Sequence, residues 1–127
     1  MDIPKDRKYS SDHEWVKVNG NNAYVGITDF AQSSLGDIVF VELPEPGKSY
    51  AAGNAIGTLE SVKAVSDVFT PISGKVLDIN KELLNDPGLI NRLPYESWIV
   101  LVEIENPQDL NVLLSSRDYE QLLQKER

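Results

Sequence analysis

The chain has 127 residues and no cysteine, so it is long enough to bury its own core but cannot use disulfides, thiol nucleophiles or cysteine-ligated zinc. Its net charge of −8 disfavours nucleic acids and anionic membranes as partners. It favours solubility and docking onto basic patches of other proteins, and on charge alone a role in solubility only is equally consistent. No apolar run approaches the length of a membrane span, and the N-terminus shows neither a secretion nor an import signal. We therefore expect one domain over residues 1–127, in a cytoplasmic protein or in the trimmed form of an organellar one.

Short strands separated by frequent turns dominate the pattern along the chain. They are predicted over residues 14–18, 23–28, 37–43, 54–60, 65–70, 75–79 and 98–105. Asn19-Gly20-Asn21-Asn22 supplies residues that tolerate positive φ in the first hairpin turn. Pro44-Glu45-Pro46-Gly47 ends the third strand, because two prolines cannot continue a hydrogen-bonded ladder. This pattern favours a β-sandwich or a β-barrel.

Short helices are predicted at a few places between and after the strands. Asp29 is expected to cap a helix over residues 30–35, which Gly36 would end. Ser115 or Ser116 is expected to cap a C-terminal helix. The apolar residues that recur at helical spacing in this last helix are Tyr119, Leu122 and Leu123.

Motifs that would mark an enzyme are absent from the sequence. It has no glycine-rich loop of a nucleotide-binding type. Its one histidine, His13, has no histidine or cysteine companion, which argues against a metal site and against a hydrolase triad. In a strand, His13 and Glu14 would point to opposite faces, so they do not suit a histidine–carboxylate couple. We interpret His13 as structural and expect no catalytic or metal-binding site.

One lysine stands out by its position. Ser61-Val62-Lys63-Ala64 joins two strands of similar length, so the Lys63 amine is expected at the tip of a hairpin. The small residues Ser61, Ala64 and Ser66 leave this tip sterically open, as an enzyme that modifies the amine would require. On this segment alone, an ordinary solvated lysine is the more common interpretation.

The segments around this hairpin resemble those of lipoyl and biotinyl carrier domains. Gly47-Lys48-Ser49-Tyr50-Ala51-Ala52-Gly53 precedes the lysine hairpin, and Pro71-Ile72-Ser73-Gly74 follows it. From about residue 9 to 119, the chain resembles one branch of that group, the H protein of the glycine cleavage system. The matching segments are Tyr9, His13-Glu14-Trp15-Val16, Val25-Gly26-Ile27-Thr28-Asp29-Phe30-Ala31-Gln32, Leu35-Gly36-Asp37-Ile38-Val39, Leu43-Pro44-Glu45-Pro46-Gly47, Glu60-Ser61-Val62-Lys63-Ala64, Pro71-Ile72-Ser73-Gly74 and Pro87-Gly88-Leu89-Ile90-Asn91.

This resemblance implies a mainly β fold, a lipoyl/biotinyl-like barrel-sandwich hybrid of two small antiparallel sheets with short helices, including a C-terminal helix. It also implies that Lys63, on the hairpin around residues 54–70, receives lipoate as an amide. The arm would take the aminomethyl group from a pyridoxal-phosphate glycine decarboxylase to a tetrahydrofolate-dependent aminomethyltransferase, and then meet dihydrolipoyl dehydrogenase. A lipoate ligase or lipoyl transferase would attach the arm, and the chain would be a non-catalytic carrier.

In the family, the loaded arm folds back into a cleft on the protein's own surface. Glu14 and Asp67 match positions that line this cleft and would pair with a charged amine, and Ile27 and Leu35 match its apolar wall. The alternative is that the two apolar residues belong to the core and the two carboxylates are solvated. Glu60 and Asp67 flank the lysine on its two strands, so we expect them to help the lipoylating enzyme to recognise the hairpin.

The chain departs from the family pattern at two places. Tyr95-Glu96-Ser97-Trp98 lacks the glycine that usually precedes the tryptophan of the closing strand, so the turn there is expected to differ. Ser34 stands where some relatives have a histidine near the cleft, so the polarity of the cleft is expected to differ as well.

Three other functions stay open at this point. A lipoyl or biotinyl domain of another complex would usually have aspartate before the lysine, or methionine on both sides, whereas Val62 and Ala64 flank it here. A lipoyl relay, which passes its group to other proteins, fits the same residues. An unmodified interaction domain would leave Lys63 as a solvated charge.

Overall fold

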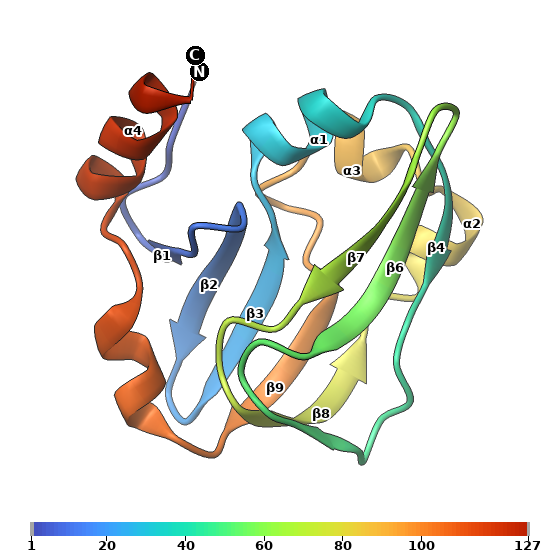
Figure 1. The fold of residues 1–127 in the computed structure, drawn as a ribbon. Coiled ribbons are helices and arrows are strands. Elements are labelled where there is room, and N and C mark those ends of the chain that lie inside the picture. Colours follow the sequence, from blue (N-terminus) through green and yellow to red (C-terminus); the bar gives the residue numbers. More distant parts are fainter. Residues whose placement is uncertain (1, 127) are drawn as a thin grey trace.

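Two antiparallel sheets form the framework of the protein (Figure 1). The computed structural model describes residues 2–126. The larger sheet has six strands in the order β1-β2-β3-β9-β8-β5, and the smaller sheet has three in the order β4-β6-β7. The strands are β1 (Lys8–Tyr9), β2 (Glu14–Asn19), β3 (Asn22–Ile27), β4 (Ile38–Glu42), β5 (Ser49–Tyr50), β6 (Ala55–Ser61), β7 (Val65–Phe69), β8 (Gly74–Ile79) and β9 (Val100–Ile104).

Buried aliphatic side chains from both sheets form one core. Val25 and Val102 contribute to it from the larger sheet, and Leu59 and Val68 contribute from the smaller one. Since side chains alternate across a strand, the residues between these point to the outer faces of the sheets. The outer face of the smaller sheet carries Phe40, Glu60 and Val65, whereas register shifts interrupt the alternation at the start of β4 and of β6.

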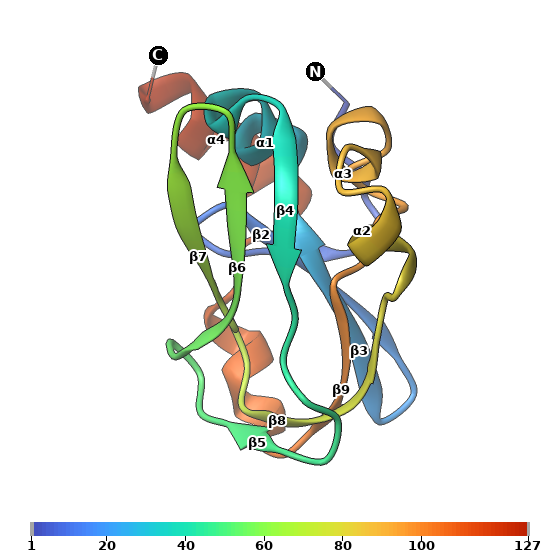
Figure 2. The ribbon, with the colours of Figure 1, turned by 90° about the vertical axis from the view of Figure 1, so that its right-hand side faces the viewer.

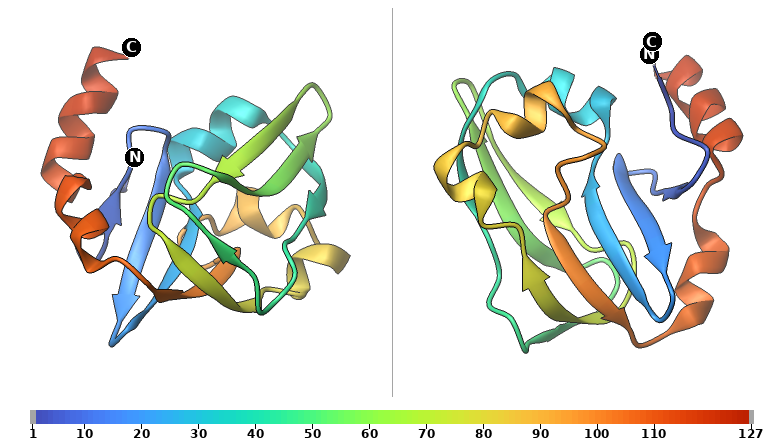
Figure 3. Two further views of the ribbon diagram at one scale, coloured as in Figure 1. Left: turned by 60° about the horizontal axis from the view of Figure 1, so that its bottom comes forward. Right: turned by 180° about the vertical axis from the view of Figure 1, so that it is seen from behind.

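Short helices lie at the ends and along one side of the framework. They are α1 (Asp29–Leu35), α2 (Glu82–Asn85), α3 (Leu89–Arg92), the 3-10 helix η1 (Pro107–Val112) and α4 (Ser116–Lys125). Helices α1 and α3 lie at the same end of the molecule as the tip of the β6–β7 hairpin (Figures 1 and 2). Helix α4 lies on the other side, next to β1 (Figure 3).

The predicted strands and C-terminal helix are confirmed, with corrections at their ends. Ser115 caps α4, because its hydroxyl accepts a hydrogen bond from the Asp118 N–H at 3.1 Å. The cap of α1 is Thr28 and not Asp29, because the extended Thr28 accepts from the Ala31 N–H at 3.3 Å. The sequence predicts no helix between β8 and β9, yet α2 and α3 lie there. Each has four residues, too few for an apolar period to show.

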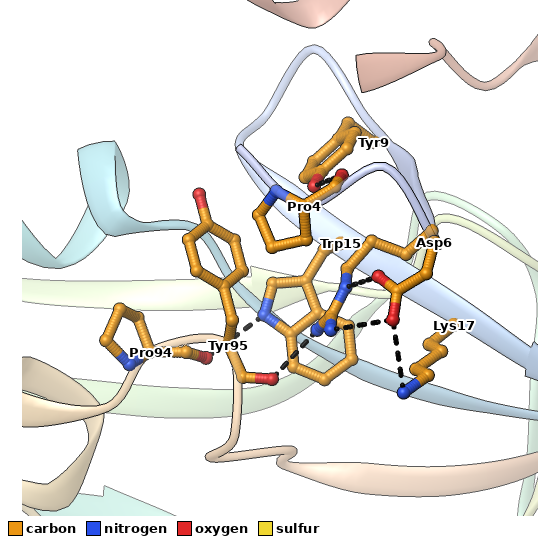
Figure 4. Close-up of polar contacts among 8 residues, drawn as sticks. Pro4, Asp6, Tyr9, Trp15, Lys17, Pro94 and Tyr95 are labelled. Atoms are coloured by element: carbon orange, nitrogen blue, oxygen red, sulfur yellow. Dashed lines mark hydrogen bonds and ion pairs between the residues drawn. The ribbon is translucent and has the colours of Figure 1, made fainter. Parts of the chain in front are cut away.

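A second apolar cluster fastens the N-terminal segment to the larger sheet. The Trp15 ring lies against Gly26, where an added Cβ would be 2.5 Å from the ring. Its Nε1 donates to the Pro94 carbonyl at 3.1 Å, and the Arg7 guanidinium lies 4.6 Å from the ring centroid. Asp6 joins Lys17 of β2 at 3.3 Å (Figure 4). The N-terminal strand is thus anchored where Glu14 begins β2.

Candidate modification site on the β6–β7 hairpin

Lys63 lies in the turn between β6 and β7, and its side chain is exposed. The buried Ser61 holds this turn in shape. Its N–H donates to the Ala64 carbonyl at 2.8 Å, and its hydroxyl accepts from the N–H groups of Lys63 at 3.3 Å and Ala64 at 3.0 Å. The sequence predicts Ser61 only as a small residue that leaves the tip open. In the structure, it also satisfies the backbone of the turn.

The tip is also tied to the loop between α1 and β4. The Val62 N–H donates to the Asp37 carbonyl at 3.0 Å. The Lys63 side chain lies over Gly36, with Cε 3.3 Å and Nζ 3.9 Å from the position that a Cβ on Gly36 would occupy. Gly36 ends α1 with a φ of +84°, which favours glycine. The lysine side chain is therefore exposed, but its distal end lies against Gly36.

Asn91 of α3 holds the loop that contains Gly36 in place through side-chain hydrogen bonds. Its Nδ2 donates to the Gln32 side chain and to the Gly36 carbonyl, both at 2.9 Å. Its Oδ1 accepts from the Ile38 N–H at 2.9 Å. One side chain thus joins α1, the loop after it and the first residue of β4. Sequence analysis missed this role, because an asparagine in a short loop-flanked segment gives no sign of partners 53 to 59 residues away.

A cavity of about 200 Å³ lies between α1 and the edge strand β7. Glu14, Ile27, Leu35 and Asp67, the four residues predicted for a cleft, all line it, and so does Ser34. The cavity lies close to the contact between Gly36 and the Lys63 side chain, because its lining residue Leu35 directly precedes Gly36 in the chain. Its volume is below the roughly 300 Å³ of sites that enclose drug-sized ligands, so it suits the end of an arm better than a whole free ligand.

Glu14 is the buried carboxyl of this cavity, with 3% of its surface exposed. The Ser10 hydroxyl donates to Oε1 at 2.7 Å, and the Phe69 N–H donates to Oε2 at 3.3 Å. Burial raises the pKa of Glu14 to about 7, although both hydrogen bonds stabilise the charged form. Burial therefore makes this carboxyl keep its proton to a higher pH than an exposed glutamate does.

Asp67 is a contrasting carboxyl, because it is exposed. The Thr58 hydroxyl of the neighbouring strand donates to its Oδ1 at 3.2 Å. Of the two apolar residues, Ile27 is buried and Leu35 is half-buried against the core. Both line the cavity as well, so the core and the cavity-wall interpretations apply together.

Comparisons with known proteins agree with this geometry. The family model described as "Glycine cleavage H-protein" matches residues 7–126. A glycine cleavage system H protein of Carboxydothermus hydrogenoformans is 54% identical over 125 residues, which cover 98% of this chain and 96% of that protein. One of Syntrophomonas wolfei is 53% identical over 127 residues, with 100% and 98% covered. The crystal structure of a glycine cleavage system H protein from Mycobacterium marinum matches with a TM-score of 0.88 at 37% identity, covering 96% of this chain and 99% of that one.

The chain belongs to the glycine cleavage H-protein family. The resemblance described from its motifs is confirmed, and so is the predicted mainly β fold of two antiparallel sheets with a C-terminal helix. The larger sheet contains two strands that the sequence did not predict, β1 and β5. Each has two residues, which is too short to show an alternating pattern.

Asp67 lines the cavity, but Glu60, the other predicted recognition residue, does not. Glu60 is exposed on the outer face of the smaller sheet, where Val65 is its cross-strand partner. Asp67 lies two residues further along β7, opposite Thr58. The two predicted recognition residues of this H-protein chain therefore share one sheet face.

His13 joins helix α4 to the cavity. Its Nδ1 is 2.8 Å from the Tyr119 hydroxyl, and its Nε2 is 3.0 Å from a carboxylate oxygen of Glu126. The Tyr119 hydroxyl also lies 2.7 Å from the Thr28 hydroxyl. His13 lies just before β2, which begins at Glu14 as predicted, and its backbone has a φ of +69°.

Within residues 2–126, no group of three histidine, aspartate or glutamate side chains is placed to hold a metal ion. Over the same residues, no helix combines the length and the apolar character that crossing a bilayer requires.

Proposed function

We propose that Lys63 carries a lipoyl group in amide linkage and that this chain serves as the lipoyl-bearing carrier of a glycine cleavage system. The observation that carries the proposal is the exposed Lys63 amine at the tip of the β6–β7 hairpin, in a chain of the H-protein family. The arm would take the aminomethyl group from a pyridoxal-phosphate glycine decarboxylase to a tetrahydrofolate-dependent aminomethyltransferase. Reoxidation of the arm would fall to dihydrolipoyl dehydrogenase. A cytoplasmic location stays a prediction.

Attachment of the arm requires a free amine and an activated acyl donor. The Lys63 ammonium gives up a proton, and its nitrogen attacks the carbonyl carbon of a lipoyl adenylate or thioester. A C–N bond forms, the bond from that carbon to the leaving oxygen or sulfur breaks, and the leaving group takes the bonding electrons. The nitrogen loses its second proton to the base or to the leaving group, which leaves a neutral amide. The exposed tip lets a lipoate ligase or lipoyl transferase surround the amine and supply the base.

When attached, the lipoyl group would supply the sulfur atoms for group transfer and redox chemistry, since the chain has no cysteine. The residues of the chain would present and shelter the arm. They include no nucleophile or acid–base pair that the proposal needs, so the chain itself would be a non-catalytic carrier.

We propose the cavity beside α1 as the shelter for the arm. Ile27 and Leu35 would contact its methylenes, and Glu14 and Asp67 would pair with a charged amine at its end. Burial of four methylenes gives about 3 kcal/mol at most, at about 0.8 kcal/mol each. A gain of that size favours the sheltered arm and still lets it swing out to a partner enzyme.

Glu60 and Asp67 remain the proposed recognition residues for the lipoylating enzyme, because both project from the hairpin strands onto one exposed face. Glu60→Ala and Asp67→Ala variants should be lipoylated more slowly than the wild-type chain. Equal rates would remove both residues from the proposal.

Intact-mass analysis after incubation with a lipoate–protein ligase, lipoate and ATP tests the attachment. We expect a mass gain of one lipoyl amide in the wild-type chain and none in Lys63→Arg, which keeps the charge but cannot be acylated in the same way. The lipoylated chain should then support glycine–bicarbonate exchange by the decarboxylase. A lipoylated chain that fails in this exchange would point to the relay function.

A further inference from the structure

A row of exposed side chains crosses the outer face of the smaller sheet beside the hairpin tip. In the strand register, Phe40 is the partner of Glu60, and Glu60 is the partner of Val65. Directly opposed residues point to the same face, and Phe40 and Val65 are 53% and 68% exposed. Val62, in the turn next to Lys63, is 71% exposed. We call Phe40, Glu60, Val62 and Val65 the tip patch.

No other element within residues 2–126 covers the tip patch. Figure 2 shows β7, β6 and β4 side by side toward the viewer, and no helix of the described residues lies in front of them. Single exposed apolar residues are common on protein surfaces, but apolar side chains grouped on neighbouring strands indicate an interaction site. Phe40 and Val65 are two strand spacings apart, about 10 Å, which one partner surface can span.

The charges around the tip patch have one sign. Strands β4, β6 and β7 contain no lysine or arginine, and their charged residues are Glu42, Glu60 and Asp67. Lys63, in the turn beside the patch, loses its charge when it is acylated. A surface that fits the tip patch would therefore have an apolar centre and a basic rim.

We propose that the tip patch is the docking surface for the enzyme that acylates Lys63. This inference rests on the proposed function. The lysine amine reaches only about 6 Å from its Cα, the length of five staggered single bonds. A catalytic centre that joins an acyl group to this amine must therefore come into contact with the hairpin tip. Enzymes that use the finished arm meet it a whole acyl chain further out, so they need not contact the patch.

This geometry predicts a specific kinetic effect. The tip patch contributes contacts to the enzyme–carrier complex, whereas the amine and its support at Gly36 stay unchanged when the patch is altered. Loss of the patch should therefore raise the KM for the carrier and leave kcat nearly unchanged. The basic rim of the enzyme predicts in addition that KM rises with ionic strength.

The test compares a patch variant with a matched control in steady-state lipoylation by a lipoate–protein ligase, lipoate and ATP. The double variant Phe40→Ser/Val65→Thr should raise KM by about tenfold, as for the removal of central apolar contacts in an interface. The control is Leu77→Ser/Val112→Ser, which removes exposed apolar side chains on β8 and η1 and should leave KM unchanged. Thermal unfolding of both variants establishes that they are folded.

A charge variant makes the test independent of the apolar substitutions. Glu42→Lys should raise KM and weaken its dependence on salt, because it reverses one charge beside the patch. If the double variant does not fold, this variant alone decides the proposal. An unchanged KM and salt dependence in Glu42→Lys would then overturn it.

The remaining outcomes separate this inference from the function on which it rests. If the wild-type chain is not acylated at Lys63, the proposed function fails. If it is acylated and the folded patch variant has the wild-type KM, only the docking proposal fails. Variants lipoylated to completion should support glycine–bicarbonate exchange within about twofold of wild type, since the arm reaches the decarboxylase. A folded patch variant that loses exchange after complete lipoylation, while its KM for lipoylation stays at the wild-type value, would assign the patch to the arm-using enzymes and overturn the proposal.

Discussion

The Lys63 side chain lies across Gly36, and its Cε is 3.3 Å from the place where a Cβ on Gly36 would be. The residue that ends α1 therefore supports the side chain that we propose is lipoylated. This contact links a loop and a hairpin that are 27 residues apart in the sequence. It makes the orientation of the amine depend on a residue that carries no chemistry of its own.

Gly36→Ala should slow lipoylation of Lys63 by several-fold, because the new Cβ displaces the lysine side chain. The matched control is Gly53→Ala, since Gly53 has a similar φ of +90° and an added Cβ there meets nothing within 4 Å. Both variants should lose roughly 1 kcal/mol of stability for a side chain at positive φ. Lipoylation rates by intact mass, with urea unfolding, separate the two effects. Equal rates for both variants would show that the contact does not position the amine.

Asn91→Ala should loosen the hairpin tip and destabilise the protein by roughly 1–3 kcal/mol, because it leaves the Ile38 N–H and the Gly36 carbonyl without their side-chain partner. Hydrogen exchange should show faster exchange of the Val62 amide, which bonds to the adjacent Asp37 carbonyl. Asn21→Ala, on an exposed turn, is the control. Wild-type protection of Val62 in Asn91→Ala would mean that the brace does not reach the tip.

Glu14 should make stability depend on pH. Burial raises its pKa from the usual 4.5 to about 7, so between these pH values the folded chain holds a proton that the unfolded chain has released. Stability from this group therefore falls as pH rises from about 4.5 to 7 and stays reduced above that. The variant Glu14→Gln lacks this loss. Its stability relative to wild type should increase by roughly 2–3 kcal/mol from pH 4.5 to pH 8.

Urea unfolding of both proteins at the two pH values measures this difference. Glu60→Gln, which removes an exposed carboxyl instead of a buried one, serves as the control. A pH-independent difference between wild type and Glu14→Gln would contradict the effect of burial on this carboxyl.

Tyr119→Phe should weaken the contact between the first turn of helix α4 and the wall of the cavity. The variant loses the hydroxyl that lies 2.8 Å from His13 and 2.7 Å from Thr28, at a cost of about 1–2 kcal/mol. Its ring can still stack on Tyr9, so the helix should stay folded. Hydrogen exchange in α4 should rise, whereas Tyr50→Phe, on the far edge strand β5, should leave it unchanged. Identical exchange in α4 for both variants would argue against the His13–Tyr119 connection as its anchor.

Local pattern alone predicted most of the strands and the position of Lys63, because alternation and turn residues act over a few neighbouring positions. It failed where elements are very short, as in β1, β5, α2 and α3, since two to four residues show no period. It also misplaced the cap of α1 by one residue, because Thr28 and Asp29 are both good caps and only the backbone angles distinguish them.

The sequence by itself determined the family, since its ordered motifs extend along nearly the whole chain, and it determined which lysine occupies a hairpin turn. The family resemblance also predicted a cleft lined by Glu14, Leu35 and Asp67, but only the packing of β2, α1 and β7 against one another brings these residues around one cavity. Only the tertiary structure decided that Asn91 braces the lysine support and that Phe40 and Val65 share an uncovered face. These relations join residues far apart in the chain, so they follow from how the two sheets and the short helices pack and not from any local pattern.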